Sequence, residues 1–123
     1  MGDIVKNLNK YPQVREVPFT KEDLIKFEEQ IVSRWEDGQI RAPVHLSNGN
    51  EDELIEVFGK IDYSDYVFST WRSHYHALLH GISPTWIEYQ ILQGKSISLC
   101  NFDHNFYSSA IVTGVIPIAL GTA

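Results

Sequence analysis

The sequence predicts an α/β fold in which helices pack against a sheet. Several stretches carry helix-start and helix-stop signals, and one short run between two of them, residues 66–70, is rich in β-branched and aromatic side chains. The chain of 123 residues is 43% hydrophobic and holds three Trp, six Tyr and six Phe, so it can build a hydrophobic core. These features indicate one folded domain.

The first helix follows a polar, proline-containing stretch, residues 1–19, which we expect to form an extended N-terminal arm. Thr20 has the properties of a helix N-cap, and acidic residues at the next positions suit the positive end of the helix dipole. Apolar residues then recur at the spacing of one helix face: Leu24, Phe27, Ile31 and Trp35. The polar faces are expected to carry Lys21, Glu28, Glu29 and Arg34. The helix is expected to end at Asp37–Gly38.

A second helix is expected over residues 49–59, where three acidic residues occupy the first turn. Its inward face is expected to consist of Leu54, Ile55, Val57 and Phe58. The run 66–70 then predicts a strand, which places Trp71 and Arg72 at the carboxyl end of that strand. Ligands of open α/β sheets bind at such ends, so this position is a candidate binding site.

The second half of the chain predicts further helices. Residues 74–80 form a short helix closed by Gly81, and Ser83–Pro84 begins another that reaches about Leu92. Residues 93–109 are rich in small and polar side chains and predict a loop. Residues 110–123 are almost wholly apolar and predict a buried helix with Pro117 near its start. A buried helix without an end signal indicates a truncated or split polypeptide.

Composition excludes several classes of protein. The formal charge of -6 gives no electrostatic reason to bind nucleic acid or an anionic membrane. The single cysteine, Cys100, excludes an internal disulfide framework and suits a reducing compartment. No apolar run approaches the roughly 20 residues of a membrane span. We therefore expect a soluble, cytoplasmic protein.

Two residues are candidates for binding and acid–base chemistry. Arg72 can bind phosphate oxygens through its planar guanidinium, although a surface ion pair is the simpler alternative for an arginine. His45 precedes a turn formed by Ser47, Asn48 and Gly49, and a loop histidine can exchange protons near neutral pH. A histidine held by hydrogen bonds for structural reasons is the alternative reading of His45.

The chain also carries a histidine cluster and one thiol. His74, His76 and His80 share a short predicted helix, so a zinc or iron site is one hypothesis for them. Buried or interface histidines are the alternative. Cys100 lies four residues before His104, but its apolar neighbours Leu99 and Phe102 predict a buried, unreactive thiol.

Four segments, in the same order, resemble the alpha subunit of thiamine diphosphate-dependent 2-oxo acid dehydrogenases, the first component of pyruvate, branched-chain and acetoin dehydrogenases. The segment from His45 to Glu51 is similar to the family's HLxxGQE, and Trp71-Arg72-Ser73-His74 is similar to YRxH. His80-Gly81-Ile82-Ser83 resembles RGxS. The stretch from Asn105 to Pro117 resembles NFYGGxGIVGxxVP. The resemblance covers residues 20–123.

The resemblance implies a fold and a set of site residues. Residues 20–123 would form the N-terminal portion of a thiamine diphosphate-binding domain, with helices packed on a parallel sheet of which this chain holds the opening part. Arg72, with Trp71 beside it, would bind the diphosphate. The Ala110 carbonyl and the Val112 N–H would bond the aminopyrimidine, and the Val112 side chain would support the cofactor ring. His45 would face the substrate in an acid–base or orienting role.

The chain departs from the family pattern at several positions. Ser108 and Ser109 replace two glycines, and Trp71 replaces a tyrosine. The GDG motif that binds magnesium is expected outside this chain, so no residue here is assigned as a metal ligand. The resemblance also implies a hetero-oligomer with a beta-type subunit and a second alpha-type chain.

The leading hypothesis from the sequence is thus an alpha-type component that decarboxylates a 2-oxo acid through a thiazolium adduct and is inactive as an isolated chain. The alternatives are a non-catalytic fragment that completes a partner chain and a histidine-cluster metalloprotein.

Overall fold

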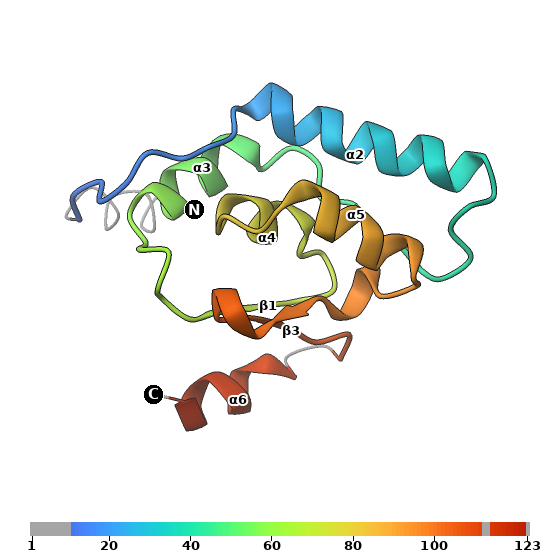
Figure 1. Ribbon diagram of the computed structural model, residues 1–123. Helices are drawn as coiled ribbons and strands as arrows, with labels where there is room; N and C mark the ends of the chain where they lie inside the picture. The colour runs from blue at the N-terminus through green and yellow to red at the C-terminus, as the bar shows by residue number, and fades with distance from the viewer. Residues whose placement is uncertain (1–10, 112–113, 123) are drawn as a thin grey trace.

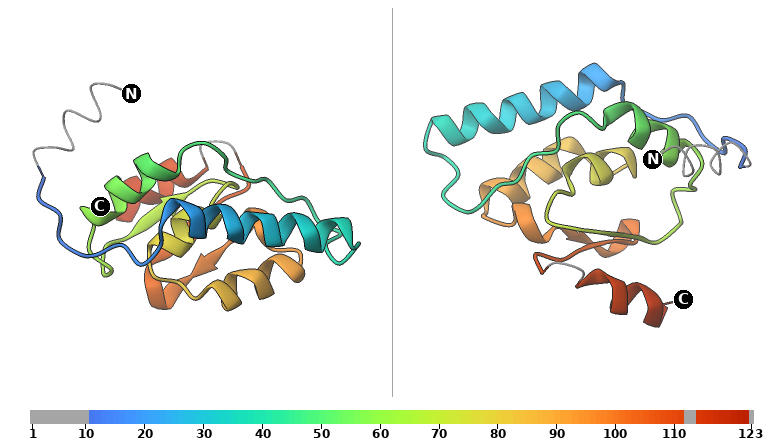
Figure 2. Two further views of the ribbon diagram at one scale, coloured as in Figure 1. Left: turned by 90° about the horizontal axis from the view of Figure 1, so that it is seen from above. Right: turned by 180° about the vertical axis from the view of Figure 1, so that it is seen from behind.

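The computed structural model describes residues 11–111 and 114–122, and it combines helices with a small sheet (Figure 1). The helices α2 (Lys21–Glu36), α3 (Glu51–Gly59), α4 (His74–Leu79) and α5 (Pro84–Leu92) lie on one side of the sheet. The helix α6 (Val115–Thr122) lies on the other side, and a view from behind shows the same order (Figure 2). The predicted combination of helices and a sheet is therefore confirmed, and the sheet is small.

The first helix begins and ends where the sequence predicts. The Asp23 N–H donates to the Thr20 hydroxyl at 3.2 Å, and the Thr20 N–H donates to the Asp23 carboxylate at 2.9 Å. This reciprocal pair satisfies two of the N–H groups that a helix start leaves free. At the other end Asp37 is the C-cap, and Gly38 follows with a φ of 74°.

The outer end of α2 differs from the prediction. Trp35 was expected on the buried face, but its side chain is 59% exposed. Residues 32–39 are all exposed, although Arg34 forms an ion pair with Glu88 of α5 at 2.9 Å. Trp35 instead lines a surface recess together with Ile31, Val32, Val44 and Leu46.

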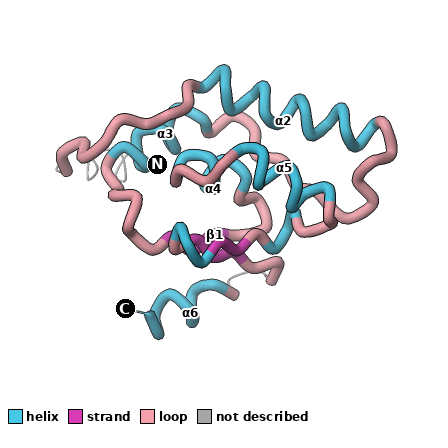
Figure 3. The backbone as a smooth tube through the Cα atoms, in the orientation of Figure 1, coloured by secondary structure: helices cyan, strands magenta, loops and turns pink. Residues whose placement is uncertain are grey.

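The sheet has three short strands in the order β1-β3-β2 (Figure 3). The strand β1 (Val67–Ser69) pairs in parallel with β3 (Phe106–Ser108), and β2 (Cys100–Asn101) pairs antiparallel with β3. The sheet is thus mixed, whereas the resemblance implied a parallel one. The prediction of a loop over 93–109 was wrong, because this stretch holds both β2 and β3. Strands of two or three residues are too short to show the alternation by which a strand is recognised.

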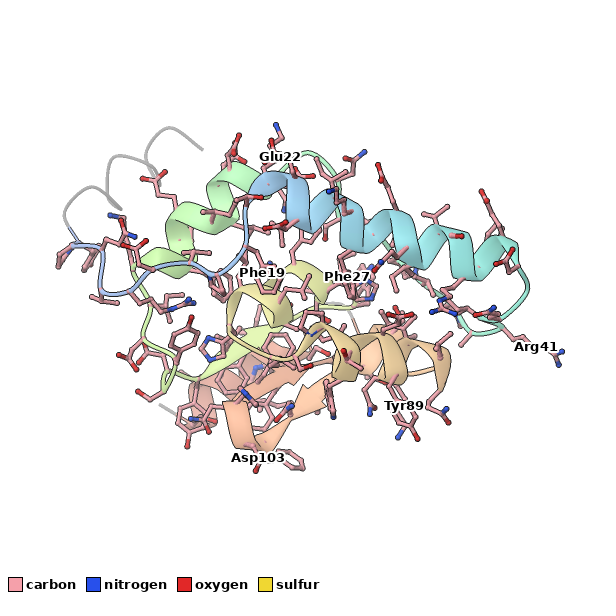
Figure 4. All side chains as sticks on the ribbon, turned by 45° about the horizontal axis from the view of Figure 1, so that its top comes forward. Phe19, Glu22, Phe27, Arg41, Tyr89 and Asp103 are labelled. Carbon is pink, nitrogen blue, oxygen red and sulfur yellow. The ribbon has the colours of Figure 1, made fainter. Side chains whose placement is uncertain are left out.

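The core lies between the helices and the sheet, and Figure 4 shows Phe27 directed from α2 into it. Its fully buried apolar side chains come from α2, α4, α5 and β3 and from the segments that join them. They include Leu24, Ile31, Tyr75, Leu78, Leu79, Ile82, Ile87, Ile91, Leu99 and Phe106. The core therefore contains side chains from both halves of the chain, from Leu24 on α2 to Phe106 on β3.

The helix α6 forms where it was expected, but it is not buried. Ile116, Ile118 and Leu120 are 60%, 54% and 78% exposed. The reason is that α6 packs against β1 on the outer face of the sheet, which covers only one side of the helix. In the described part of the chain, no helix is long and apolar enough to cross a membrane.

The described residues 11–19, which precede α2, contain neither helix nor strand. Arg15 attaches this segment to the domain, because its Nε donates to the Ile61 carbonyl at 2.8 Å and its Nη2 to the Leu79 carbonyl at 2.6 Å. The guanidinium also lies 4.0 Å from the centre of the Tyr63 ring. Gly81 closes α4 directly beside this ring.

Replacing Gly81 by alanine should destabilise the fold more than replacing Gly38. Both glycines have positive φ, which costs alanine about 1 kcal/mol. A Cβ at Gly81 would lie 2.7 Å from Cε1 of Tyr63, whereas a Cβ at Gly38 has no neighbour within 4 Å. Urea unfolding of both variants tests this, and equal losses would show that the Tyr63 ring moves without cost.

Candidate functional site

Two of the three candidate segments meet at one edge of the sheet. Trp71 and Arg72 follow β1, and Ala110 follows β3. Because β1 and β3 are parallel neighbours, their carboxyl ends lie at the same edge, where ligands of α/β sheets bind. The Ser109 N–H donates to the Ser69 carbonyl at 3.3 Å, which keeps the two exits side by side.

The third segment, residues 45–51, reaches the same edge through His45. Its imidazole meets the Trp71 ring edge-on, with the ring centres 6.2 Å apart and the planes at 65°. His45 is exposed and Trp71 is partly buried, so the indole supports a histidine that solvent can reach. The structure therefore brings together the two segments that sequence analysis selected first.

Arg72 is exposed, and its backbone N–H lies 3.4 Å from the Thr70 hydroxyl. The ion pairs of the described residues are Lys21–Asp52, Arg34–Glu88 and His74–Glu28. Within that part of the chain, the Arg72 guanidinium has no acidic partner. The alternative of a surface ion pair is thus not observed, and the guanidinium can receive an anion.

A buried carboxyl group lies beneath this edge. Glu28 was expected on a polar face of α2, but its residue is only 6% exposed. Its Oε1 accepts the Ser47 N–H at 3.0 Å and lies 3.7 Å from Nδ1 of His74. The sequence held a signal for this, because the spacing of Glu28 from Leu24 and Ile31 puts all three on one helix face.

A second buried carboxyl group holds the other end of the same segment. Glu51 is 2% exposed, and its Oε1 accepts the Tyr75 hydroxyl at 3.1 Å. Burial raises the pKa of Tyr75, and the nearby carboxyl groups of Glu28 and Glu51 raise it further. The phenol therefore keeps its proton and acts as the donor.

The histidines of α4 have separate partners. Nε2 of His74 lies 2.8 Å from the Ser96 hydroxyl, Nδ1 of His76 lies 2.6 Å from the Ser69 hydroxyl, and Nε2 of His80 lies 2.9 Å from the Asp65 carbonyl. Among the described residues, no group of three His, Cys, Asp or Glu side chains could hold a metal ion. The hypothesis of a histidine metal cluster was therefore wrong for these residues, since each ring is turned toward a different neighbour.

Cys100 is exposed rather than buried, which corrects the sequence-based expectation. It lies on β2, at the edge of the sheet, and its thiol is 3.7 Å from the Ser108 carbonyl. Nδ1 of His104, the histidine four residues later, is 3.1 Å from the Asn101 side-chain oxygen. Cys100 is exposed because β2 is an outermost strand of the sheet, and in the described part of the chain no strand pairs with its free side.

The candidate segment that follows β3 is described only in part. Ala110 is exposed in a bend after β3, whereas Val112 lies outside the described residues. The two serines that replace glycines both make hydrogen bonds. The Ser108 hydroxyl donates to the Leu99 carbonyl at 2.6 Å, and the Ile111 N–H donates to the Ser109 hydroxyl at 3.1 Å. The Ser109 bond is local and stabilises the bend that presents Ala110, whereas the Ser108 bond joins the end of β3 to the residue before β2.

The chain is similar to curated alpha subunits of pyruvate dehydrogenase. The pyruvate dehydrogenase E1 component subunit alpha of Porphyra purpurea is 28% identical over 92% of this chain and 41% of its own length. Chloroplastic subunit alpha-3 of Arabidopsis thaliana is 30% identical over 83% of this chain and 27% of its own length. The rice (Oryza sativa subsp. japonica) subunit alpha-3 is 28% identical over 79% of this chain and 25% of its own length.

The chain therefore spans less than half of each of these relatives. No protein-family model matches it. The similarities confirm the predicted resemblance to the alpha subunit of a thiamine diphosphate-dependent dehydrogenase.

Removing the Tyr75 hydroxyl should destabilise the fold. In Tyr75→Phe the Glu51 carboxyl loses its donor inside the protein, and a buried polar group without a partner costs about 1–3 kcal/mol. Tyr66→Phe is the matched control, because Tyr66 is 56% exposed and should lose less than about 0.5 kcal/mol. Urea unfolding measures both variants, and equal stability of the two would contradict a role for the Tyr75–Glu51 bond.

Stability should fall as the pH falls from about 6.5 toward 4. Burial lowers the pKa of His76 from 6.5 to about 4 and also lowers that of His80. Between these values the unfolded chain binds the proton and the folded chain does not, so acid favours unfolding by about 1.4 kcal/mol per pH unit for each proton. The pKa values of Asp23 and Asp62 are lowered by N–H groups of Thr20 and Ser64, so both carboxyls titrate below this range.

The variant His76→Asn tests the pH dependence, because asparagine can bond Ser69 without titrating. Unfolding free energies measured at pH 7, 6 and 5 should change less steeply in this variant than in the unmodified protein. An unchanged slope would show that His76 accepts a proton equally well in the folded and unfolded states.

Proposed function

We propose that residues 20–123 form the N-terminal portion of an alpha-type, thiamine diphosphate-binding domain, and that the chain contributes to decarboxylation of a 2-oxo acid. The observation that carries the proposal is the contact of His45 with Trp71, next to Arg72. It brings together, at the carboxyl end of β1, two segments that are separate in the sequence and similar to family motifs. An open strand end with a free guanidinium fits an anionic cofactor.

Each candidate residue has a distinct proposed role. Arg72 binds the diphosphate through two parallel N–H donors, and Trp71 lies beside it and supports His45. The Ala110 carbonyl accepts from the aminopyrimidine, and the Val112 N–H would bond the same ring, while the Val112 side chain would support the cofactor. The exposed imidazole of His45 orients the substrate or transfers a proton to or from it.

The cofactor supplies an electron sink for the carbanion left by decarboxylation. The residues of this chain bind and orient the cofactor, and the edge-on indole of Trp71 limits the orientations that His45 can take. Magnesium is proposed to bind through residues outside this chain, together with the diphosphate. A beta-type subunit and a second alpha-type chain are the proposed partners.

A non-catalytic module that completes a partner chain is the second candidate. The observation that favours it is the exposed apolar surface of α6, where Ile116, Ile118 and Leu120 are uncovered. Such a module needs the same fold but no anion site. Cofactor binding therefore distinguishes the two candidates.

Arg72→Ala should weaken cofactor binding by about 10- to 100-fold, the value of a hydrogen-bonded charge contact. The cofactor affinity of Arg72→Lys should lie between those of the unmodified protein and Arg72→Ala, because lysine keeps the charge but loses the bidentate geometry. Calorimetry with magnesium and thiamine diphosphate on the assembled protein measures all three affinities.

The matched control is Arg41→Ala, which removes another exposed arginine, one that is directed to solvent (Figure 4). Its affinity should equal that of the unmodified protein. Equal binding by Arg72→Ala and Arg41→Ala would contradict a diphosphate contact at Arg72. Absence of binding to the unmodified assembly would favour the non-catalytic module.

A further inference from the structure

We propose that Glu28 is a positioning residue that holds both halves of the candidate site in register, an inference that rests on the proposed function. Its single carboxyl group contacts the segment that carries His45 and the helix that follows Arg72. Neither contact involves the cofactor or the substrate directly. Glu28 would thus act through Ser47 and His74.

The first contact fixes the segment that carries His45. The Ser47 N–H donates to Oε1 of Glu28 at 3.0 Å, and Ser47 is itself 8% exposed. Ser47 is two residues after His45, so a shift of its backbone would move the imidazole relative to Trp71. A buried carboxyl group is a strong acceptor for a backbone N–H, since little water competes for the bond.

The second contact fixes the start of α4. Nδ1 of His74 lies 3.7 Å from the same Oε1, and within the described residues it has no hydrogen-bond partner. The other ring nitrogen, Nε2, is held by the Ser96 hydroxyl at 2.8 Å, so the imidazole faces Glu28 with its free nitrogen. His74 is 1% exposed and follows Arg72 by two residues. The carboxyl group therefore also limits where Arg72 can lie.

Glu51 supports the same arrangement from the opposite end of the segment. It accepts from Tyr75, the residue after His74, so both ends of residues 45–51 are tied to the first turn of α4. The titratable groups that surround Glu28 are therefore His74 and, through its hydroxyl, Tyr75. Glu28 differs from Glu51 in contacting both segments through one oxygen.

A buried carboxyl group is a poor means of stabilising a fold. Apolar residues of similar volume often replace both partners of a buried ion pair with no loss of stability, whereas replacing one partner leaves the other unpaired. If Glu28 served packing alone, methionine would replace it without other consequence. If it positions the two segments, Glu28→Met should keep the fold and loosen residues 45–51.

The test compares Glu28→Met and Glu28→Gln with Glu29→Gln, a control at the exposed neighbouring position on α2. The first measurement is hydrogen–deuterium exchange of peptides covering residues 45–51 in the full chain without cofactor. Glu28→Met should exchange at least about tenfold faster there, and by a larger factor than in the rest of the chain, since it removes the acceptor for the Ser47 N–H. Glu28→Gln keeps an oxygen acceptor and should retain most of the protection.

The second measurement is calorimetry with magnesium and thiamine diphosphate on the assembled protein. Glu28→Met should bind the cofactor about tenfold more weakly, while Glu29→Gln should bind it as the unmodified protein does. Failure of the unmodified assembly to bind would overturn the proposed function, whereas the exchange measurement would still decide on the Ser47 contact.

Two results would overturn the positioning role. One is unchanged exchange over residues 45–51 in Glu28→Met. The other is faster exchange that is matched throughout the chain by a lower unfolding midpoint, because Glu28 would then be a stabilising residue without a specific effect on the site.

Discussion

The site depends on two buried carboxyl groups, Glu28 and Glu51, that attach residues 45–51 to the first turn of α4. That segment has no helix or sheet of its own until Glu51 begins α3, so its backbone needs partners from elsewhere. Burying a carboxyl group is costly unless donors surround it, and here the donors are the Ser47 N–H and the Tyr75 hydroxyl. The cost of burying Glu28 and Glu51 is therefore offset when residues 45–51 adopt the conformation that forms both hydrogen bonds. That conformation determines where His45 lies.

The sheet provides the second constraint. Parallel pairing of β1 with β3 sends Trp71, Arg72 and Ala110 to one edge. The helical layer beneath is tightly packed, whereas the edge itself and α6 remain open to solvent. A rigid base with exposed polar groups at a strand end suits a ligand-binding site that other chains complete. The exposed apolar residues of α6 fit the same interpretation, because such a surface gains stability when it is covered.

Local signals were enough to predict the helices from the sequence. The capping box at Thr20 and Asp23 and the glycine after Asp37 fixed both ends of α2, since each acts within a few residues. Contacts between distant residues were not predictable in this way. The strands β2 and β3 are defined by pairing rather than by pattern, and Glu28 is buried because Ser47 and His74 approach it. The exposure of Trp35 and α6 depends on which elements pack beside them, which no local pattern records. His45, Trp71 and Arg72 could be selected because they carry recognisable chemistry. The helical spacing of Glu28 from Leu24 and Ile31 indicates its buried face, but no local pattern indicates its contacts with Ser47 and His74.

Fluorescence of Trp71 during titration with magnesium and thiamine diphosphate tests the central claim most directly. The substitutions Trp35→Phe and Trp86→Phe remove the other two tryptophans of this chain. The emission of the partner chains is removed by using tryptophan-free partners or is subtracted, so that the remaining signal comes from Trp71. We predict a saturable change in Trp71 emission. Thiamine without the diphosphate should produce a much weaker change, because Arg72 then has no anion to bind. Unchanged Trp71 emission while calorimetry shows the cofactor bound would place the cofactor elsewhere and contradict the account.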